Sequence, residues 1–371
     1  MGTLADERTV AARILEHVAA GTTDLADAVW HEPVANYRSV ERFDAERALL
    51  RRRPVPFCPS AALGDAGSYV ARDAAGVPIV AVRDRDGRVR AFRNACRHRG
   101  TQLVEGSGCA NAFVCGYHGW TYRLDGALAH VPHEHGFPGL DKQTRGLVSV
   151  HAVERHGLVF VNQDAPTPPG DELAELDGLI GPEQRLIAAA EQEHPTNWKV
   201  LVETFLEGLH IRFAHGRTFY PLQYDNLNLV ETFGEHSRVT FPYRNVEKLA
   251  TVPTAERTLD ARVTFVYHLF PNVIIATFPG RILMFVIEPR EVDRTAIVTY
   301  ALSDRPPGDG EERQRAGQAL VLDGGAEDFA LARAVQRGLA SGANEHLELG
   351  LFEGALGHFH RNLDAALADH T

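Results

Sequence analysis

The sequence has little sulfur and no long apolar run. It contains four cysteines and two methionines among 371 residues, and no stretch of about 18 consecutive apolar residues occurs, so we expect no membrane-spanning helix. The N-terminal segment breaks its apolar positions with charges and shows neither a basic leader nor an apolar core, which predicts a cytoplasmic protein. The 49 Asp and Glu outnumber the 38 Lys and Arg, which argues against nucleic acid as a partner.

The four cysteines do not suggest a disulfide framework. Cys96 and Cys115 both belong to a motif that also contains histidines. Metal ligation is the better use of such thiols in a reducing compartment. Cys58 and Cys109 stand outside the motif, and we expect both to be small buried side chains.

Apolar periodicity divides the chain into regions of different type. Residues 5–30 have the spacing of an amphipathic helix, and residues 56–164 form short β-like runs with Asp-Gly turns. A proline-rich stretch at 165–170 predicts a linker. A helix at 197–215 follows, and then come strands at 263–270, 273–278, 282–287 and 296–302 and helices at 311–322, 326–339 and 351–367.

This order predicts the fold class α+β. A small all-β domain is followed by a domain whose helices cover an antiparallel sheet. We place an N-terminal helical segment at residues 1–37, the all-β domain at 38–165 and the α+β domain at 166–371. The first segment is expected to pack on the last domain.

Two loops of the all-β region each offer one thiolate and one imidazole. They are Cys96-x-His98 and, after sixteen further residues, Cys115-x-x-His118. Zinc sites usually pair like ligands on one loop, whereas a Rieske [2Fe–2S] centre takes two Cys on one iron and two His on the other. The pattern therefore favours a Rieske cluster over zinc.

The predicted helix at 197–215 contains a second pair of histidines. Glu203, Glu207 and His210 fall on one stripe of a regular helix, whereas His215 points elsewhere. If both histidines bind one metal, the helix must bulge or end near Phe213. Taken alone, the pair could equally be ordinary histidines, since the chain has 18.

Two histidines need one carboxylate to form the facial triad that holds Fe(II) and leaves positions open for O₂. We prefer Asp328, in the helix expected at 326–339. Glu327 and Asp323 are the alternatives.

The chain resembles the oxygenase component, or α subunit, of Rieske non-haem iron aromatic-ring-hydroxylating oxygenases. The resemblance covers about residues 38–340 and rests on Cys96-Arg-His98-Arg-Gly100, Cys115-Gly-Tyr-His118-Gly-Trp120, Asn197-Trp-Lys199 and Glu207-x-x-His210-x4-His215. It implies a helix-grip fold for the second domain. It also implies that the four loop residues bind the [2Fe–2S] cluster.

The resemblance implies roles for the other site residues as well. His210, His215 and an acid matching Asp328 would bind the mononuclear Fe(II). Glu207 would link the two kinds of metal centre between neighbouring subunits of a homotrimer, and Asn197 is a further catalytic candidate. Electrons would come from NAD(P)H through a separate reductase or ferredoxin, because this chain has no dinucleotide fingerprint and no ferredoxin cysteines.

The expected function is O₂-dependent hydroxylation of a small aromatic or alicyclic substrate. Many ring dioxygenases of the family have Asp where this chain has Glu207, while Glu is seen in carnitine- and betaine-type members. The alternative is therefore a monooxygenase or oxidative N- or O-demethylase of a quaternary ammonium or methoxy compound. A third hypothesis, an electron carrier using the cluster alone, is disfavoured by His210 and His215.

Apolar residues near the second metal site are candidates for a substrate pocket, although core packing is the more common role of such residues. They are Leu206, Phe213, Phe219, Tyr220, Phe265, Tyr267, Phe270, Ile274 and Met284.

Overall fold

The structure, a computed structural model, describes residues 3–164, 166–305 and 311–368. The chain forms two compact units, one of residues 47–186 and the other of residues 1–46 together with 187–371. The domain boundaries placed after residues 37 and 165 stay predictions. Within the described residues, no helix is both long and apolar enough to cross a bilayer.

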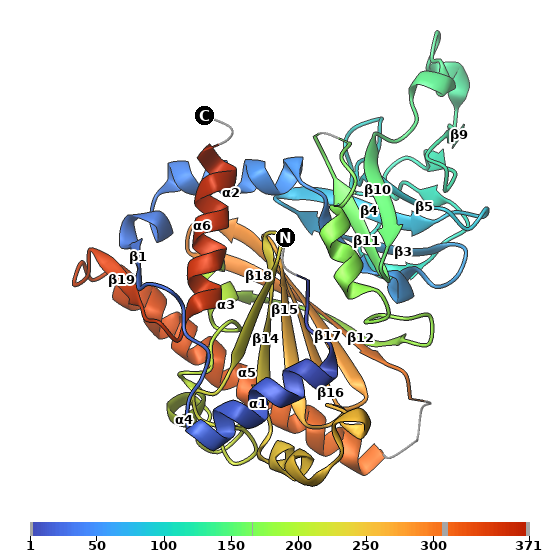
Figure 1. Ribbon diagram of the computed structural model, residues 1–371. Coiled ribbons are helices and arrows are strands. Elements are labelled where there is room, and N and C mark those ends of the chain that lie inside the picture. Colours follow the sequence, from blue (N-terminus) through green and yellow to red (C-terminus); the bar gives the residue numbers. More distant parts are fainter. Residues whose placement is uncertain (1–2, 165, 306–310, 369–371) are drawn as a thin grey trace. The chain divides into compact units, whose positions relative to one another are not determined.

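The unit of residues 47–186 contains two antiparallel sheets (Figure 1). The larger has the strand order β2 (Val55–Pro59), β11 (Leu158–Asn162), β10 (Ser149–Arg155), β5 (Val89–Arg93), β4 (Val77–Arg83), β3 (Ser68–Ala74) and β6 (Gly106–Cys109). The smaller has the order β7 (Phe113–Val114), β8 (Thr121–Tyr122) and β9 (Leu128–His130). The glycines of both expected Asp-Gly turns, Gly87 and Gly126, have positive φ, which suits tight hairpins. The predicted all-β domain is confirmed.

The core of this unit surrounds the two motif cysteines. Cys96 and Cys115 are buried together with Phe113, Trp120 and Tyr122 in one apolar cluster. The loops that carry the cysteines are therefore held by packing as well as by their own turns.

The other unit is built on one seven-stranded antiparallel sheet. Its order is β12 (Arg185–His194), β18 (Arg294–Ser303), β17 (Arg281–Glu291), β16 (Val273–Phe278), β15 (Val263–Leu269), β14 (His236–Pro242) and β13 (Leu229–Phe233). Together with its helices, this sheet confirms the predicted α+β class.

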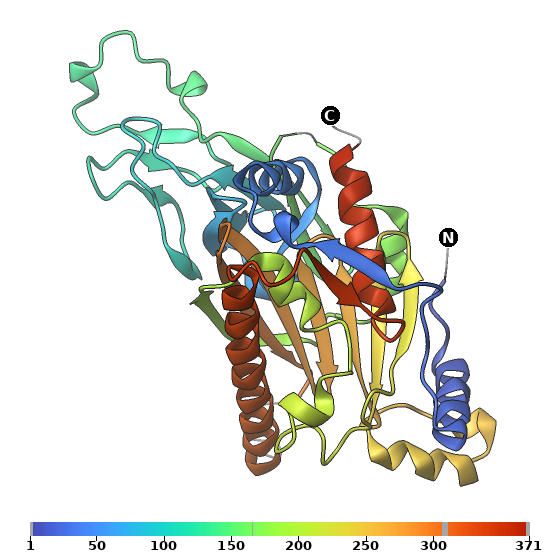
Figure 2. The same cartoon turned by 90° about the vertical axis from the view of Figure 1, so that its left-hand side faces the viewer.

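Helices cover both faces of this sheet, which explains its nearly continuous apolar strands. On one face, α1 (Glu7–Ala20) and the 3₁₀ helix η6 (Arg244–Thr251) pack on residues such as Leu229 and Val263. On the opposite face, α3 (Trp198–Glu203) contacts β17, and α6 (Gly354–Ala368) contacts β13 and β14 (Figure 2). The long helix α5 (Glu311–Leu339) lines a cavity together with Thr264 and Val266 of this second face.

The continuous helix predicted for residues 197–215 is wrong. The segment forms α3 and a short α4 (Ile211–Ala214), with turns between them. Gly208 lies in this break, where a Cβ atom would come within 2.8 Å of the Asn228 side chain. Such close packing favours glycine, which is a poor helix former.

The two helices predicted at 311–322 and 326–339 are a single helix, α5. Gly324 and Gly325 lie between the two predicted ranges and are part of this helix. Gly324 allows close packing, because the ring of Phe219 lies where a Cβ atom of residue 324 would be. The first predicted helix is shorter than expected, since α1 ends before Gly21, which adopts φ 62°.

The Asn197-Trp198-Lys199 motif anchors the start of α3. Asn197 caps the helix by accepting a hydrogen bond from the Lys199 backbone N–H at 3.0 Å. The buried Lys199 ammonium lies 2.7 and 2.9 Å from the two carboxylate oxygens of Glu46, which also accept a hydrogen bond from the Trp198 indole at 2.8 Å. A buried charge paired in this way fixes the position of the helix.

The remaining elements are short. Strands β1 (Trp30–Pro33) and β19 (His346–Leu349) pair with each other, and α2 spans Val40–Arg52. The other 3₁₀ turns are Val34–Tyr37, Ser60–Leu63, Glu134–Gly136, Lys142–Thr144, Asp171–Leu176 and Thr254–Glu256.

Candidate metal centres

The two Cys/His loops have the same backbone design. In the first, the Cys96 N–H donates to the Thr101 carbonyl and the Cys96 carbonyl accepts from Gly100 N–H, at 2.8 and 2.9 Å. In the second, Cys115 makes the same two bonds with Trp120 and Gly119 at the same distances. Gly100 and Gly119 have φ of 79° and 73°, a conformation that glycine adopts without strain.

These loops bring their four candidate ligands together. The Cys96 and Cys115 thiols are buried and close enough to share a hydrogen bond. The His98 and His118 rings lie 4.7 Å apart between centroids, and Trp120 stacks on His98 at 5.0 Å with an interplanar angle of 7°. The two loops therefore bring their thiols together and their imidazoles together.

The arrangement fits a two-iron cluster better than a single zinc. A tetrahedral zinc would bring all four ligand atoms within about 4 Å of one another. Among the described residues, the only group of candidate ligands whose atoms all lie within 4.8 Å of one another is His210, His215 and Asp328. His98 Nδ1 is also buried without a hydrogen-bond partner in the described part of the chain, as expected for an atom that binds a metal.

Backbone hydrogen bonds stabilise the Cys115 thiolate. Burial is the largest influence and acts to raise the pKa of the Cys115 thiol, but hydrogen bonds from the Tyr117 and His118 N–H groups, together with those of the Cys96 and Thr101 side chains, outweigh it and lower the pKa. Tyr122 lies beside the other thiol, with its hydroxyl 3.3 Å from Cys96 Sγ and accepting from Arg97 N–H at 2.9 Å.

The two cysteines outside the motif differ from each other. Cys58 is buried, and burial raises the pKa of its thiol to about 12, so it is an unreactive core residue as expected. Cys109 is exposed on β6, and the expectation that it is buried is wrong.

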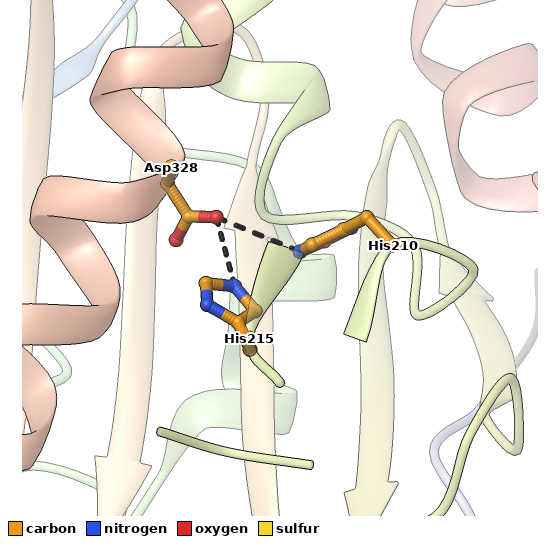
Figure 3. Close-up of side chains that lie close together, drawn as sticks. All are labelled: His210, His215 and Asp328. Atoms are coloured by element: carbon orange, nitrogen blue, oxygen red, sulfur yellow. Dashed lines mark ion pairs between the residues drawn. The ribbon is translucent and has the colours of Figure 1, made fainter. Parts of the chain in front are cut away.

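The second candidate centre joins three residues that are far apart in the sequence. Asp328 Oδ1 lies 2.9 Å from His215 Nε2 and 3.6 Å from His210 Nε2, and the three candidate ligand atoms lie within 4.8 Å of one another. Figure 3 shows both imidazoles converging on the carboxylate that α5 supplies. This buried Oδ1 has no hydrogen-bond partner of normal geometry among the described residues. The set therefore has the donor chemistry of a facial triad.

The break between α3 and α4 positions the two histidines. His210 directly precedes α4 and His215 directly follows it. The helix end near Phe213 agrees with the sequence-based requirement, although the main interruption comes earlier, at residues 204–210.

A carboxylate contacts the Nδ1 atom of each imidazole, opposite the Nε2 atom that faces Asp328. Glu207 Oε1 is hydrogen-bonded to His210 Nδ1, and Glu327 Oε2 lies 2.9 Å from His215 Nδ1 and accepts from the Thr218 hydroxyl at 2.6 Å. Burial lowers the pKa of both histidines, but the neighbouring carboxylates outweigh it and raise both pKa values. Such contacts orient Nε2 of each ring toward Asp328.

A cavity of about 510 Å³ opens beside this triad. It lies between the sheet face and α5, and most of its lining is apolar. Six phenylalanines contribute to it, namely Phe205, Phe219, Phe241, Phe278, Phe285 and Phe329. A cavity of this size and character suits a small organic molecule.

The structure sorts the alternatives that the sequence left open. Asp323 is exposed and outside the triad, while Glu327 holds the far side of His215. Of the nine apolar pocket candidates, Phe219 lines the cavity. The prediction is wrong for the other eight, which are not part of the lining, and Phe213 is 84% exposed. Sequence reasoning missed the positioning role of Glu327, whose signal was its place next to Asp328.

Asn197 does not line the cavity. Besides capping α3, its buried side chain donates hydrogen bonds to the Tyr37 and Val292 carbonyls at 3.1 and 2.7 Å. All of these contacts are to backbone, which is typical of a structural residue.

Comparison with known proteins identifies the class. Residues 53–147 match the Rieske [2Fe-2S] domain, and residues 183–369 match the family described as ring hydroxylating alpha subunit (catalytic domain). The chain therefore belongs to the family of Rieske oxygenase alpha subunits. This confirms the predicted class of oxidoreductase and its cofactors, a Rieske [2Fe–2S] cluster and a mononuclear iron.

The chain is similar to several individual oxygenase subunits. The oxygenase subunit of carnitine monooxygenase from Escherichia coli K12 is 29% identical, with 92% of this chain and 94% of the relative covered. The same subunit from Acinetobacter baumannii is 34% identical over 51% of this chain, a match that spans about half of that relative's length, 53%. A quaternary ammonium Rieske monooxygenase solved with L-carnitine has the same fold, with a TM-score of 0.78, 23% identity and complete coverage of both chains.

Proposed function

We propose that this chain is the oxygenase component of a Rieske monooxygenase that oxidises a small quaternary ammonium compound. The observation that carries the proposal is the triad of His210, His215 and Asp328 beside an apolar, phenylalanine-lined cavity. The similarity to carnitine monooxygenase subunits supports this substrate class over an aromatic or alicyclic one.

In this proposal each metal has its own set of residues. Cys96 and Cys115 take one iron of the cluster and His98 and His118 the other, while the triad takes the mononuclear iron. When bound, these groups supply one-electron transfer and the reduction of O₂. In the overall reaction one oxygen atom enters the substrate and the other leaves as water, with two electrons supplied from outside.

Glu207 has two tasks. It holds His210 through Nδ1, which keeps Nε2 directed at the metal position. We assign it a second contact, with a cluster-ligand histidine of a neighbouring subunit, as part of the electron path. Asn197 acts only as a positioning residue, since its hydrogen bonds fix the start of the helix that leads to Glu207.

The cavity wall supplies the substrate environment. Six phenylalanine rings exclude water from the reacting groups, and aromatic faces attract a quaternary ammonium through cation–π contacts. The apolar lining also suits the methyl groups of such a substrate.

We propose a cytoplasmic homotrimer that takes electrons from NAD(P)H through a separate reductase. Electron transfer between neighbouring subunits of the trimer can be tested by mixing two variants. Cys115→Ser chains should lack the cluster, and Asp328→Ala chains should lack the mononuclear iron. If electrons pass between subunits, the reassembled mixture regains turnover that neither variant has alone. If turnover does not recover after subunit exchange has been verified, electron transfer between subunits is contradicted.

The substrate class is tested by turnover with a surrogate reductase. Trimethylammonium compounds and small aromatic compounds are supplied in parallel, and O₂ uptake is compared with oxidised product by mass spectrometry. We expect uptake matched by product with trimethylammonium compounds. Coupled hydroxylation of the aromatic compounds alone would refute the proposed substrate class.

A further inference from the structure

One wall of the cavity is formed by side chains from three neighbouring strands, β16, β17 and β18. Register pairs Phe278 with Arg281 and Ala276 with Leu283 between β16 and β17, and Leu283 with Ala301 between β17 and β18. The cavity is lined by all five of these residues. The small side chains of Ala276 and Ala301, on either side of Leu283, leave room above the sheet. Arg281 is two positions before Leu283 on β17 and therefore lies on the same face.

Arg281 and Phe285 lie at opposite ends of this part of the wall. Phe285 packs against Phe205, with 5.0 Å between ring centroids, and Phe205 lies two residues before Glu207. Phe285 follows Arg281 by four positions along β17, or about 13 Å of extended strand. The cation is therefore well removed from the residues around Phe205.

Arg281 has no partner for its charge. The described residues offer its guanidinium no ion pair and no hydrogen bond, and burial alone lowers the pKa of this group. Arginine stays protonated at any physiological pH. This partly buried guanidinium is therefore available to a ligand, and a carboxylate matches its geometry.

The other charged groups of the cavity leave this position to a ligand. Its lining carboxylates, Glu207 and Asp328, both contact the metal-site histidines. His194 also lines the cavity, with its ring 4.2 Å from that of Phe329, but burial and the nearby Arg333 lower its pKa, which favours the neutral imidazole. Arg333 also lines the cavity, but its side chain is exposed on α5.

A second cation lies at the same end of the sheet. The guanidinium of Arg305 occupies the space above Gly280, in the turn between β16 and β17, and leaves no room for a Cβ there. The end of the cavity at Arg281 is therefore positively charged, while the triad is rich in carboxylate.

We propose that Arg281 binds a carboxylate of the substrate and so restricts the enzyme to substrates that carry an anionic group at a distance from the oxidised carbon. Building on the proposed function, this defines the substrate as a zwitterion, a trimethylammonium carboxylate, rather than a simple quaternary ammonium cation. A cation without a carboxylate would meet uncompensated repulsion from Arg281.

Binding can be measured without turnover by calorimetry on the fully metal-loaded protein under anaerobic conditions. The probes are γ-butyrobetaine and its carboxamide, and phenylacetate and phenylacetamide. We expect each carboxylate that binds to bind roughly 10- to 100-fold more tightly than its amide, the usual effect of a charged hydrogen bond. Arg281→Gln should reduce this ratio to about one, and Arg281→Lys should restore part of it.

The matched control is Arg337→Gln, on the exposed surface of α5 outside the cavity lining, which should keep the ratio. Cluster absorbance and melting temperature verify that each variant is folded. Equal binding of acid and amide, no binding of either carboxylate, or loss of the preference with Arg333→Gln instead of Arg281→Gln overturns the inference. If Arg281-dependent binding is found for phenylacetate only, the anion site stands and the quaternary ammonium function fails.

Discussion

The two metal centres of this chain are assembled in opposite ways. The proposed cluster site would take its four ligands from two short loops within 23 residues of sequence, and each loop repeats the same turn with a glycine four residues after its cysteine. The proposed iron site would take two histidines from either end of a one-turn helix and a carboxylate from α5, more than a hundred residues later. One centre is a local motif, and the other exists only in the folded unit.

Because of this difference, the two centres depend on different contacts for their stability. The cluster loops depend on their own turns and on the apolar cluster around Cys96 and Cys115. The triad depends on the placement of α4 and α5, two separate elements. The buried Lys199–Glu46 ion pair anchors α3, the helix that precedes α4 in the chain. The centres should therefore be separable by single substitutions.

The largest expected effect is loss of the cluster. Cys115→Ser removes a buried thiolate ligand, so the Rieske absorbance and EPR signal should disappear while mononuclear iron binding remains. Cys109→Ser is the control, since this exposed thiol lies outside the loops and its removal should leave the spectrum unchanged. Retention of the cluster signal in Cys115→Ser would contradict the ligand assignment.

The converse change should remove the iron alone. Asp328→Ala leaves two histidines, too few for stable Fe(II) binding, so one iron per chain should be lost with the cluster spectrum intact. Asp323→Ala, on the exposed side of the same helix, serves as the matched variant. Iron loss in Asp323→Ala with retention in Asp328→Ala would show that the carboxylate is misassigned.

Glu207→Gln should separate metal binding from turnover. The amide can still contact His210, so both centres should stay loaded, while product formation falls by about 100-fold because the charged link is lost. Metal analysis and coupled O₂ uptake on the same sample measure the two effects. Unchanged coupled turnover would show that Glu207 is not part of the electron path.

Glu327→Gln should have the smallest effect. Its carboxylate orients His215 through Nδ1 but does not face the metal, so we expect a loss of roughly 10-fold in iron affinity. Titration of the iron-free protein with Fe(II) measures this change. An effect as large as that of Asp328→Ala would mean that Glu327 is itself a ligand.

Sequence reasoning reached the cluster site more completely than the iron site for a physical reason. Cys96, His98, Cys115 and His118 carry their chemistry in their spacing, and the hairpins around them follow from local turn residues. The break at residues 204–210 depends on contacts such as that of Gly208 with Asn228, which no local pattern contains. Periodicity therefore extended the helix through it.

The carboxylate and the cavity show the same limit. Asp328, Glu327 and Asp323 are close in sequence, and only the rotation of α5 against the sheet distinguishes them. The apolar strands predicted a buried face, but both faces are covered, so Phe265 and Phe278 look alike in sequence although only Phe278 lines the cavity. Arg281 had no signal of its own, because its isolation is a property of the folded sheet.

The iron content of the purified, reconstituted protein tests the central claim most directly. Two centres in one chain predict three irons and two acid-labile sulfides per chain, with a Rieske EPR signal from the reduced cluster and a separate Fe(II) that Asp328→Ala removes. Two irons per chain, all accounted for by the cluster signal and unaffected by Asp328→Ala, would contradict the oxygenase assignment and identify an electron carrier instead.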